Sequence, residues 1–293
     1  MKVILFGQTL HPEDIPVIRQ IIQTIQALDG SIYVYGDLMK KIEPVIPEAV
    51  SLRVIRNHRE LKKQELDMLF SLGGDGTILK AATFIRDAGV PILGINLGRL
   101  GFLATMDKHE VSRIIPSLND NKYTVESRSL LGLECNKPIF GDTQFALNDF
   151  TITKRDNSSM IMIRTFLDGE YLNTYWADGL IVATPTGSTG YSLSCGGPII
   201  LPDSNSFVIT PVAPHNLTAR PIVVPDNVTI TFEVEGRTEN FLCTLDSRFE
   251  PITSDHHISI RKAPFEMHLI KLAEDSILET IREKLNWGKD LRN

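Results

Sequence analysis

Cysteine is scarce in this chain, and no hydrophobic run is long enough for a membrane helix. The three cysteines, Cys135, Cys195 and Cys243, are odd in number and never form a CxxC pair, which is typical of a reducing cytoplasm. No run approaches the roughly 18 apolar residues of a transmembrane helix. The opening MKVILFGQTL reaches polar residues too early for a signal peptide. We therefore expect a cytoplasmic protein without a membrane partner.

An excess of basic residues is also missing. The 293 residues include 30 Lys and Arg against 36 Asp and Glu, which gives a net charge of −6. Nucleic acids and anionic membranes select basic surfaces, so neither is expected as a partner. Hydrophobic residues make up 42% of the chain, which is enough for a substantial core, and the length favours two domains.

Several common catalytic motifs are absent. The chain contains no GxxxxGK[ST], no GxGxxG after a strand, no HExxH and no GxSxG. The first absence excludes a P-loop protein, and the second means that the usual dinucleotide fingerprint is missing. The missing HExxH gives no sign of a zincin, and the missing GxSxG disfavours an α/β-hydrolase. The seven histidines show no metal-ligand spacing, so we expect no metal site made by the protein alone.

Strand and helix patterns alternate through residues 1–122. Helical spacing of Ile and Leu runs from 15 to 28, and a second helix is predicted over 78–87. The expected strands are Val3–Phe6, Ser31–Tyr35, Leu52–Ile55, Met68–Leu72 and Val90–Ile95. This alternation predicts an N-terminal α/β domain with a mainly parallel sheet and helices on both of its faces.

The pattern changes at about residue 123. Short β-rich runs separated by turn signals such as Asp168-Gly169 continue to residue 272. We therefore expect a β-rich, sandwich-like domain over 123–272. Residues 273–293 return to helical spacing and are expected to form a C-terminal helix that packs back on the N-terminal domain.

The first candidate site is the segment Gly73-Gly74-Asp75-Gly76-Thr77, between an expected strand and an expected helix. The glycines let a ligand approach the backbone, and free amides at a helix N-terminus attract phosphate. A carboxylate at Asp75 can hold Mg²⁺ or accept the proton of an attacking hydroxyl, and both roles indicate phosphoryl transfer. The alternative is a tight turn in which Asp75 lies near the helix cap.

The second candidate site is the segment from Asp178 to Ser194, DGLIVATPTGSTGYSLS. Its hydroxyl groups suit ribose and phosphate, and Tyr191 offers a flat face to a base. Asn148-Asp149 could read an adenine edge or a ribose diol. A Ser/Thr-rich turn and an ordinary Asx turn are the alternatives for these two segments.

Together these segments resemble the NAD kinase family. The matching pieces follow the family's order over about residues 70–222 and are GGDGT at 73–77, GINLGRLGFL at 94–103, Asn148-Asp149, the segment 178–194, and Gly196-Gly197-Pro198. The stretch 214–221 also fits. The GGDGT motif alone is shared with lipid and sugar kinases, whereas DGLIVATPTGSTGYSLS is far more specific.

The resemblance implies ATP-dependent phosphorylation of the 2′-hydroxyl of the adenosine ribose of NAD. Asp75 would be the general base, and Mg²⁺ or another divalent cation would arrive with ATP. Polyphosphate as a donor and a homodimer or homotetramer are further implications. The implied binding residues are Gly73, Gly74, Asp75, Gly76, Thr77, Lys80, Asn148, Asp149, Asp178, Thr186, Thr189, Gly190, Tyr191, Ser192, Leu193, Ser194 and Ala213.

The chain departs from the family pattern at a few positions. Asp149 replaces a usual Glu, and Gly190 replaces the more usual Ala. Trp176 stands where bacterial members often have a basic residue, and Ser247-Arg248 where a Gly-Gln pair is common. Two other functions remain open: a lipid or sugar kinase that shares only the Asp75 loop, and a dinucleotide sensor without catalysis.

Overall fold

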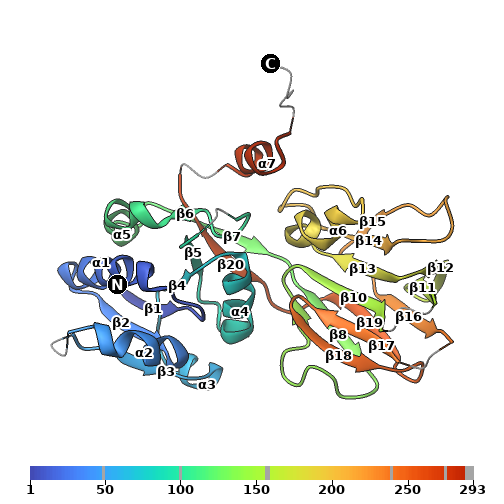
Figure 1. The fold of residues 1–293 in the computed structure, drawn as a ribbon, viewed down its shortest axis with the longest axis horizontal. Helices are drawn as coiled ribbons and strands as arrows, with labels where there is room; N and C mark the ends of the chain where they lie inside the picture. Colours follow the sequence, from blue (N-terminus) through green and yellow to red (C-terminus); the bar gives the residue numbers. More distant parts are fainter. Residues whose placement is uncertain (48–49, 99–100, 156–158, 238–239, 274–275, 288–293) are drawn as a thin grey trace. The chain divides into compact units, whose positions relative to one another are not determined.

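The chain divides into two compact units, which we describe from a computed structural model covering residues 1–47, 50–98, 101–155, 159–237, 240–273 and 276–287 (Figure 1). Unit 1 comprises Met1–Ser127 and His268–Asn293, and unit 2 comprises Arg128–Met267. Unit 2 is therefore inserted into the sequence of unit 1.

Unit 1 is built on an eight-stranded sheet with the order β3-β2-β1-β4-β5-β20-β7, and β6 pairs with β5. The pairs β1–β2, β1–β4, β2–β3, β4–β5, β5–β6 and β5–β20 are parallel. The strands are β1 (Lys2–Phe6), β2 (Ser31–Tyr35), β3 (Arg53–Ile55), β4 (Met68–Leu72), β5 (Ile92–Asn96), β6 (Met106–Asp107), β7 (Thr124–Arg128) and β20 (Met267–Lys271). The expected parallel α/β domain is confirmed.

Helices cover both faces of this sheet (Figure 1). They are α1 (Ile15–Ala27), α2 (Gly36–Ile42), α3 (His58–Leu61), α4 (Asp75–Ile85) and α5 (Val111–Asn119). A further helix, α7 (Ile277–Leu285), follows β20 in the sequence. Alternate residues of a strand point to opposite faces. Val3 and Leu5 share a core with α1, α2 and α5, whereas the ring of Phe6 lies 5.4 Å from that of Phe84 on α4.

The sequence patterns predicted α1 and α4 but missed α2, α3 and α5. The helices α2 and α3 are too short for a clear period, with seven and four residues. Helix α5 contains Pro116 in its interior, a residue that normally argues against a helix. The burial of Val111, Ile114 and Ile115 against unit 1 stabilises α5 despite this proline.

Unit 2 consists of two six-stranded sheets in which all the described pairs are antiparallel. Their orders are β15-β14-β13-β10-β17-β18 and β12-β11-β16-β19-β8-β9. The strands are β8 (Leu131–Cys135), β9 (Phe145–Ala146), β10 (Asp149–Lys154), β11 (Ile161–Leu167), β12 (Glu170–Ala177), β13 (Gly179–Ala183), β14 (Ser206–Val212), β15 (Ile222–Pro225), β16 (Ile230–Glu235), β17 (Phe241–Leu245), β18 (Arg248–Ile252) and β19 (Ile258–Lys262).

The inner faces of the two sheets form one hydrophobic core. Phe150 of β10 stacks on Phe232 of β16 with ring centroids 5.4 Å apart, which joins the sheets at their centre. Inward residues alternate with outward ones, as in β11, where Ile161, Ile163 and Thr165 are buried. The expected β-rich, sandwich-like domain is confirmed.

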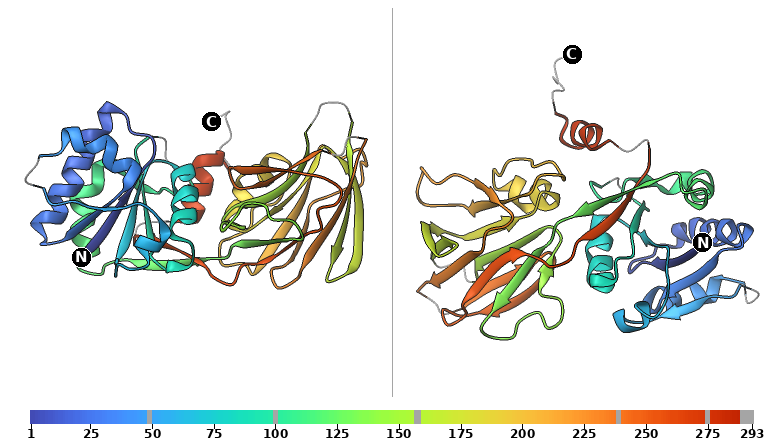
Figure 2. Two further views of the ribbon diagram at one scale, coloured as in Figure 1. Left: turned by 90° about the horizontal axis from the view of Figure 1, so that it is seen from below. Right: turned by 180° about the vertical axis from the view of Figure 1, so that it is seen from behind.

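The boundaries differ from those expected at 122/123 and 272/273. Strands β7 and β20 belong to the sheet of unit 1, where they lie side by side (Figures 1 and 2). β-Propensity predicts that a segment is a strand, but it does not specify the sheet that the strand joins. Helix α7 is present within the expected segment, and Ile281 on it is buried. Its packing on the N-terminal domain stays a prediction. No helix among the described residues combines the length and apolar character needed to cross a membrane.

Candidate functional site

The first group of candidate residues lies at the carboxyl ends of β1 and β4 in unit 1. The chain leaves β1 toward β2 on one side and leaves β4 toward β5 on the other, so the two strands flank the topological switch point of the sheet. Open α/β sheets bind ligands at this point. Gly7 follows β1 and Gly73 follows β4. A Cβ atom at Gly7 would lie 3.3 Å from the Leu72 carbonyl oxygen. Gly7 was not among the residues proposed from the sequence.

The glycine loop after β4 exposes main-chain groups. Gly73 has φ +148°, and a Cβ there would lie 2.3 Å from Thr77 Oγ1, so the turn requires glycine. Cβ atoms at Gly74 and Gly76 would meet nothing within 4 Å. A ligand can therefore approach the start of α4, as proposed from the sequence. Lys80 lies on an exposed part of the same helix, one turn after Gly76.

The Asp75 carboxylate is held by main-chain amides of a distant segment. Oδ2 accepts a hydrogen bond from the Phe102 amide at 2.8 Å, and Oδ1 accepts bonds from Leu103 and Ala104 at 3.0 Å each. A Cβ at Gly101 would lie 1.9 Å from Oδ1, so only glycine fits there. Phe102 and Leu103 belong to the family motif GINLGRLGFL, and together with Ala104 their amides orient the candidate base.

The second group lies in unit 2 around the start of β10. Asp149 is the first residue of this strand, and Asn148 directly precedes it. Asp149 is 8% exposed. Thr184, which follows β13, donates its amide to the Asn148 carbonyl at 2.9 Å and its hydroxyl to the Leu147 carbonyl at 2.6 Å. The two polar segments singled out in the sequence are therefore hydrogen-bonded to each other.

The Ser/Thr-rich segment forms two short helices instead of a plain turn: η5 (Thr186–Thr189) and α6 (Tyr191–Ser194). η5 packs on the main chain of Asn148, since a Cβ at Gly187 would lie 2.0 Å from the Asn148 carbonyl oxygen. A Cβ at Gly190 would lie 3.9 Å from Asp149 Oδ2 and 4.0 Å from Asn148 Nδ2. Gly190 is therefore a neighbour of both polar side chains.

Several hydroxyls of this segment have partners inside the protein. Ser192 is fully buried, and its hydroxyl lies 2.8 Å from that of Thr210. Ser188 bonds to the Pro185 and Ile200 main chain, and Thr189 donates to the Thr186 carbonyl. We therefore assign the Ser192 hydroxyl to the support of the loop. The binding roles expected for Thr186 and Thr189 stay predictions.

Tyr191 and Asp178 complete the polar surroundings of Asp149. Tyr191 is 41% exposed, so its ring is open to a stacking partner. Burial raises the pKa of the Tyr191 phenol, and the charges of Cys195, Asp149 and Asp178 add to this rise. Asp178 forms an ion pair of 2.6 Å with Lys154. Among the remaining residues proposed from the sequence, Leu193 is partly buried, and Ser194 and Ala213 are exposed.

Asp149 titrates far from its ordinary range. Burial raises the pKa of its carboxyl from 3.8 to about 7, and the negative charge of Asp246 adds to this rise. The group can therefore donate a hydrogen bond in its acid form or accept one in its ionised form near neutral pH. Perturbed carboxyls of this kind occur often at functional sites.

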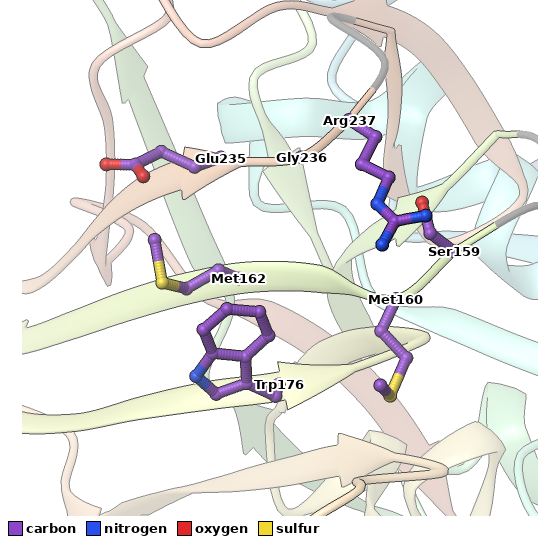
Figure 3. A pocket seen from close by; sticks show the side chains of 7 residues that line it. All are labelled: Ser159, Met160, Met162, Trp176, Glu235, Gly236 and Arg237. Carbon is purple, nitrogen blue, oxygen red and sulfur yellow. The ribbon is translucent and has the colours of Figure 1, made fainter.

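A separate hollow of about 450 Å³ lies on unit 2 between β11, β12 and the end of β16 (Figure 3). The indole of Trp176 lies beside the side chains of Met160 and Met162, and Arg237 borders the same hollow. No residue of the proposed substrate site lines it. Within the described ranges, no group of three or more His, Cys, Asp or Glu side chains is arranged to hold a metal ion.

Comparisons with known proteins cover almost the whole chain. Residues 3–123 match the ATP-NAD kinase N-terminal domain, and residues 147–272 match the ATP-NAD kinase C-terminal domain. A protein named NAD kinase from Flavobacterium psychrophilum is 44% identical over 299 residues and is aligned over 100% of both chains. One from Cytophaga hutchinsonii is 44% identical over 292 residues, with 99% of each chain covered.

Solved structures of the same fold are also found. The crystal structure of yeast NADH kinase complexed with NADH matches with a TM-score of 0.89 at 23% identity, covering 100% of this chain and 89% of that one. The structure of an NAD kinase from Archaeoglobus fulgidus in complex with ATP matches with a TM-score of 0.76 at 24% identity, covering 98% and 99%. The resemblance seen in the sequence motifs is confirmed: the chain belongs to the NAD kinase family.

Proposed function

We propose that the protein transfers the terminal phosphoryl group of Mg-ATP to the 2′-hydroxyl of the adenosine ribose of NAD and forms NADP. Asp75 acts as the general base. The observation that carries this proposal is the Asp75 carboxylate, fixed by three amides in a glycine loop at the switch point of the sheet. The relatives named NAD kinase support the same activity.

Asp75 contributes by position and by proton transfer. As the ribose oxygen attacks the terminal phosphorus, the hydroxyl proton moves to the Asp75 carboxylate, and the bond to the leaving ADP oxygen breaks. Phosphoryl transfer depends mainly on positioning and on charge neutralisation. A well-placed general base contributes on the order of 10²–10⁴-fold to the rate. The amides of Phe102, Leu103 and Ala104 limit the rotation of the carboxylate and hold it in one orientation.

In unit 2, Asn148 and Asp149 bind the adenosine part of the dinucleotide. The Asn148 Oδ1 atom is buried and has no hydrogen-bond partner among the residues that the structure describes, so it is available to a ligand donor. Tyr191 stacks on a base, and Asp178 with Thr186 and Thr189 completes the pocket. A cytoplasmic location, a homodimer or homotetramer, and polyphosphate as an alternative donor are further parts of this proposal.

The divalent cation enters as part of Mg-ATP. Mg²⁺ usually binds through one or two carboxylates plus substrate phosphates and keeps several waters. The described residues fit an ion held chiefly by substrate phosphates and water, because they form no group of three or more His, Cys, Asp or Glu side chains that could hold a metal by itself. The cation supplies positive charge to the phosphates, and the open amides of Gly74 and Gly76 add to it.

The test is formation of NADP from NAD and Mg-ATP by the purified chain, followed by coupling to glucose-6-phosphate dehydrogenase. We expect activity that is lost with EDTA. Asp75→Asn should lower kcat by about 10²–10⁴-fold, because the amide cannot accept the proton.

The control separates proton transfer from loop support. Gly101→Ala places a Cβ 1.9 Å from Asp75 Oδ1, which disrupts the contact between Asp75 and the 101–104 segment but keeps a carboxylate at position 75. A smaller loss in Gly101→Ala than in Asp75→Asn supports the base. Equal losses would show that Asp75 acts only by holding the segment. Binding of NAD without turnover would favour the sensor, and indifference to NAD would favour a lipid or sugar kinase.

A further inference from the structure

A turn of unit 2 with a buried aspartate side chain lies against the Asn148–Asp149 pair. It connects β17 to β18 through Asp246 and Ser247, and Arg248 begins β18. Asp246 has φ +53°, and its side chain is 3% exposed. A carboxylate is rarely buried to this degree unless its oxygens have partners. Ser247 and Arg248 are departures from the family pattern, and Asp246 lies directly before them in the sequence.

Asp246 binds the three consecutive amides that lead into β10. Its Oδ2 accepts a hydrogen bond from the Leu147 amide at 3.0 Å. Its Oδ1 accepts bonds from Asn148 at 2.8 Å and from Asp149 at 3.2 Å. The Asp246 amide in turn donates to the Asp149 carbonyl at 2.9 Å. These four bonds fix the backbone direction at the two residues proposed to bind adenosine.

Arg248 holds the preceding part of the same segment. Its guanidinium donates to the carbonyls of Thr143 and Phe145 and lies over the rings of Phe140 and Phe145, 5.9 and 5.7 Å from their centroids. Its Nη2 atom lies 3.9 Å from Asp246 Oδ2, so the arginine is also the counter-charge of the buried carboxylate. The turn thus binds the segment 143–149 with two side chains: Asp246 accepts hydrogen bonds from its amides, and Arg248 donates hydrogen bonds to its carbonyls.

We infer that Asp246 is a positioning residue for the dinucleotide reaction. It fixes Asn148 and Asp149 through their main-chain amides, and Arg248 is its charged partner. This inference rests on the proposed function for the role of the Asn148–Asp149 pair. Asp246 itself need not contact substrate. Its effect extends to the second polar segment, because Thr184 and η5 are built on the carbonyls of Leu147 and Asn148.

The substitution Asp246→Asn tests this role with little change in shape. Asparagine tolerates positive φ and keeps one acceptor oxygen, so the amides of Asn148 and Asp149 can still be bound. Its NH₂ group would face the Leu147 amide, which is also a donor. The variant also removes the negative charge that acts on Asp149, and the groups facing Asp149 are then Tyr191 of α6 and the uncharged residue 246.

Asp168→Asn is the matched control. Asp168 also has positive φ in a β-turn of unit 2, at φ +49°, and its Oδ1 accepts the Thr229 amide at 2.8 Å. Both variants therefore change a turn aspartate whose side chain accepts main-chain amide hydrogen bonds, one at Asp168 and three at Asp246. Asp168 makes no contact with the 143–149 segment in any of its described hydrogen bonds.

The experiment measures the full chain in two ways: steady-state kinetics for NAD and ATP, and titration of the Asp149 side-chain carbon by NMR. In Asp246→Asn we expect KM for NAD to rise at least about tenfold with KM for ATP unchanged, because misplacement of binding groups on the order of 1 Å costs up to about 10²-fold. The Asp149 pKa should fall by about one unit or more, since a neighbouring like charge is removed. Asp168→Asn should change neither quantity.

Each outcome decides one question. An Asp246→Asn protein that matches Asp168→Asn in KM for NAD and in the Asp149 titration overturns the inference. A wild-type protein that is inactive on NAD overturns the proposed function, while the NMR titration still tests the contact of Asp246 with Asp149. If Asp246→Asn does not fold, Arg248→Lys decides. It keeps the charge but cannot bind both carbonyls, so a raised KM for NAD supports the inference and an unchanged one contradicts it.

Discussion

At the scale of single residues, two carboxylates of the protein bind main-chain amides in the same way. Asp75 in unit 1 and Asp246 in unit 2 each accept three hydrogen bonds from successive amides of a distant segment. Sequence analysis identified Asp75 because three glycines surround it. It missed Asp246 because its amide partners lie almost a hundred residues away. Local patterns reveal a residue's neighbours in the chain, whereas these bonds depend on tertiary structure.

Asp149 makes the stability of the protein depend on pH. Its pKa is 3.8 in the unfolded reference and about 7 in the folded protein. Between these values the folded state binds more protons, so the free energy of unfolding falls as pH rises. The stabilisation that the folded protein gains from protonated Asp149 is fully present below pH 3.8 and is lost as pH rises through about 7.

We expect Asp149→Asn, which cannot titrate, to gain stability relative to the wild type between pH 5 and pH 8. The relative gain should be about 3 kcal/mol at most, from about 1.4 kcal/mol per unit of pKa. Urea unfolding of both proteins at the two pH values measures it. Parallel pH dependences in the two proteins would show that Asp149 does not carry the effect.

At the scale of elements, most strands and the two longest helices of unit 1 follow from sequence patterns. The two helices bury one regular face, and central strands such as β4 and β5 are short apolar runs buried at every position. The short helices η5 and α6 do not, since four-residue elements contain too little pattern and are held by tertiary contacts. The assignment of β7 and β20 to unit 1 was also not predictable, because alternation identifies a strand but not its partner.

The two glycines of the η5 region should respond differently to substitution. Gly187→Ala puts a methyl group 2.0 Å from the Asn148 carbonyl oxygen, so η5 must move away from β10. Gly190→Ala brings the methyl 3.2 Å from the Gly187 carbonyl oxygen and leaves ordinary contacts with Asn148 and Asp149. We expect Gly187→Ala to lower the free energy of unfolding by about 2–3 kcal/mol, in the range of overpacked buried sites. Gly190→Ala should change the free energy of unfolding by less than about 1 kcal/mol.

Thermal unfolding of both alanine variants, together with KM for NAD, measures this difference. Gly187→Ala should lower Tm and raise KM, and Gly190→Ala should keep both near the wild-type values. Equal Tm values for the two variants would contradict the close approach of η5 to Asn148.

At the scale of the whole molecule, unit 2 is continuous in sequence and unit 1 is not. Unit 2 is one uninterrupted segment, and its main core draws all of its buried residues from within 128–267. Unit 1 needs two segments, because β20 lies between β5 and β7 in its sheet. A fragment ending at residue 127 therefore lacks an internal strand, which leaves the main-chain groups of both neighbours unpaired.

We expect the fragment 128–267 to fold alone and to unfold cooperatively, as measured by near-UV circular dichroism and urea titration. The fragment 1–127 should bind a hydrophobic dye such as ANS and lack a cooperative transition. Joining 1–127 to 268–287 with a flexible linker should restore one. Cooperative unfolding of 1–127 alone would show that β20 is dispensable for unit 1.

The place of β20 between β5 and β7 bears on how the chain is made in the cell. A ribosome releases the polypeptide from its N-terminus, so the first 127 residues emerge long before the strand that completes their sheet. The inserted sandwich can be finished in the meantime. During translation, the loop that carries Asp75 therefore belongs to an unfinished sheet, and that sheet closes only after the whole of the inserted unit 2 has been synthesised.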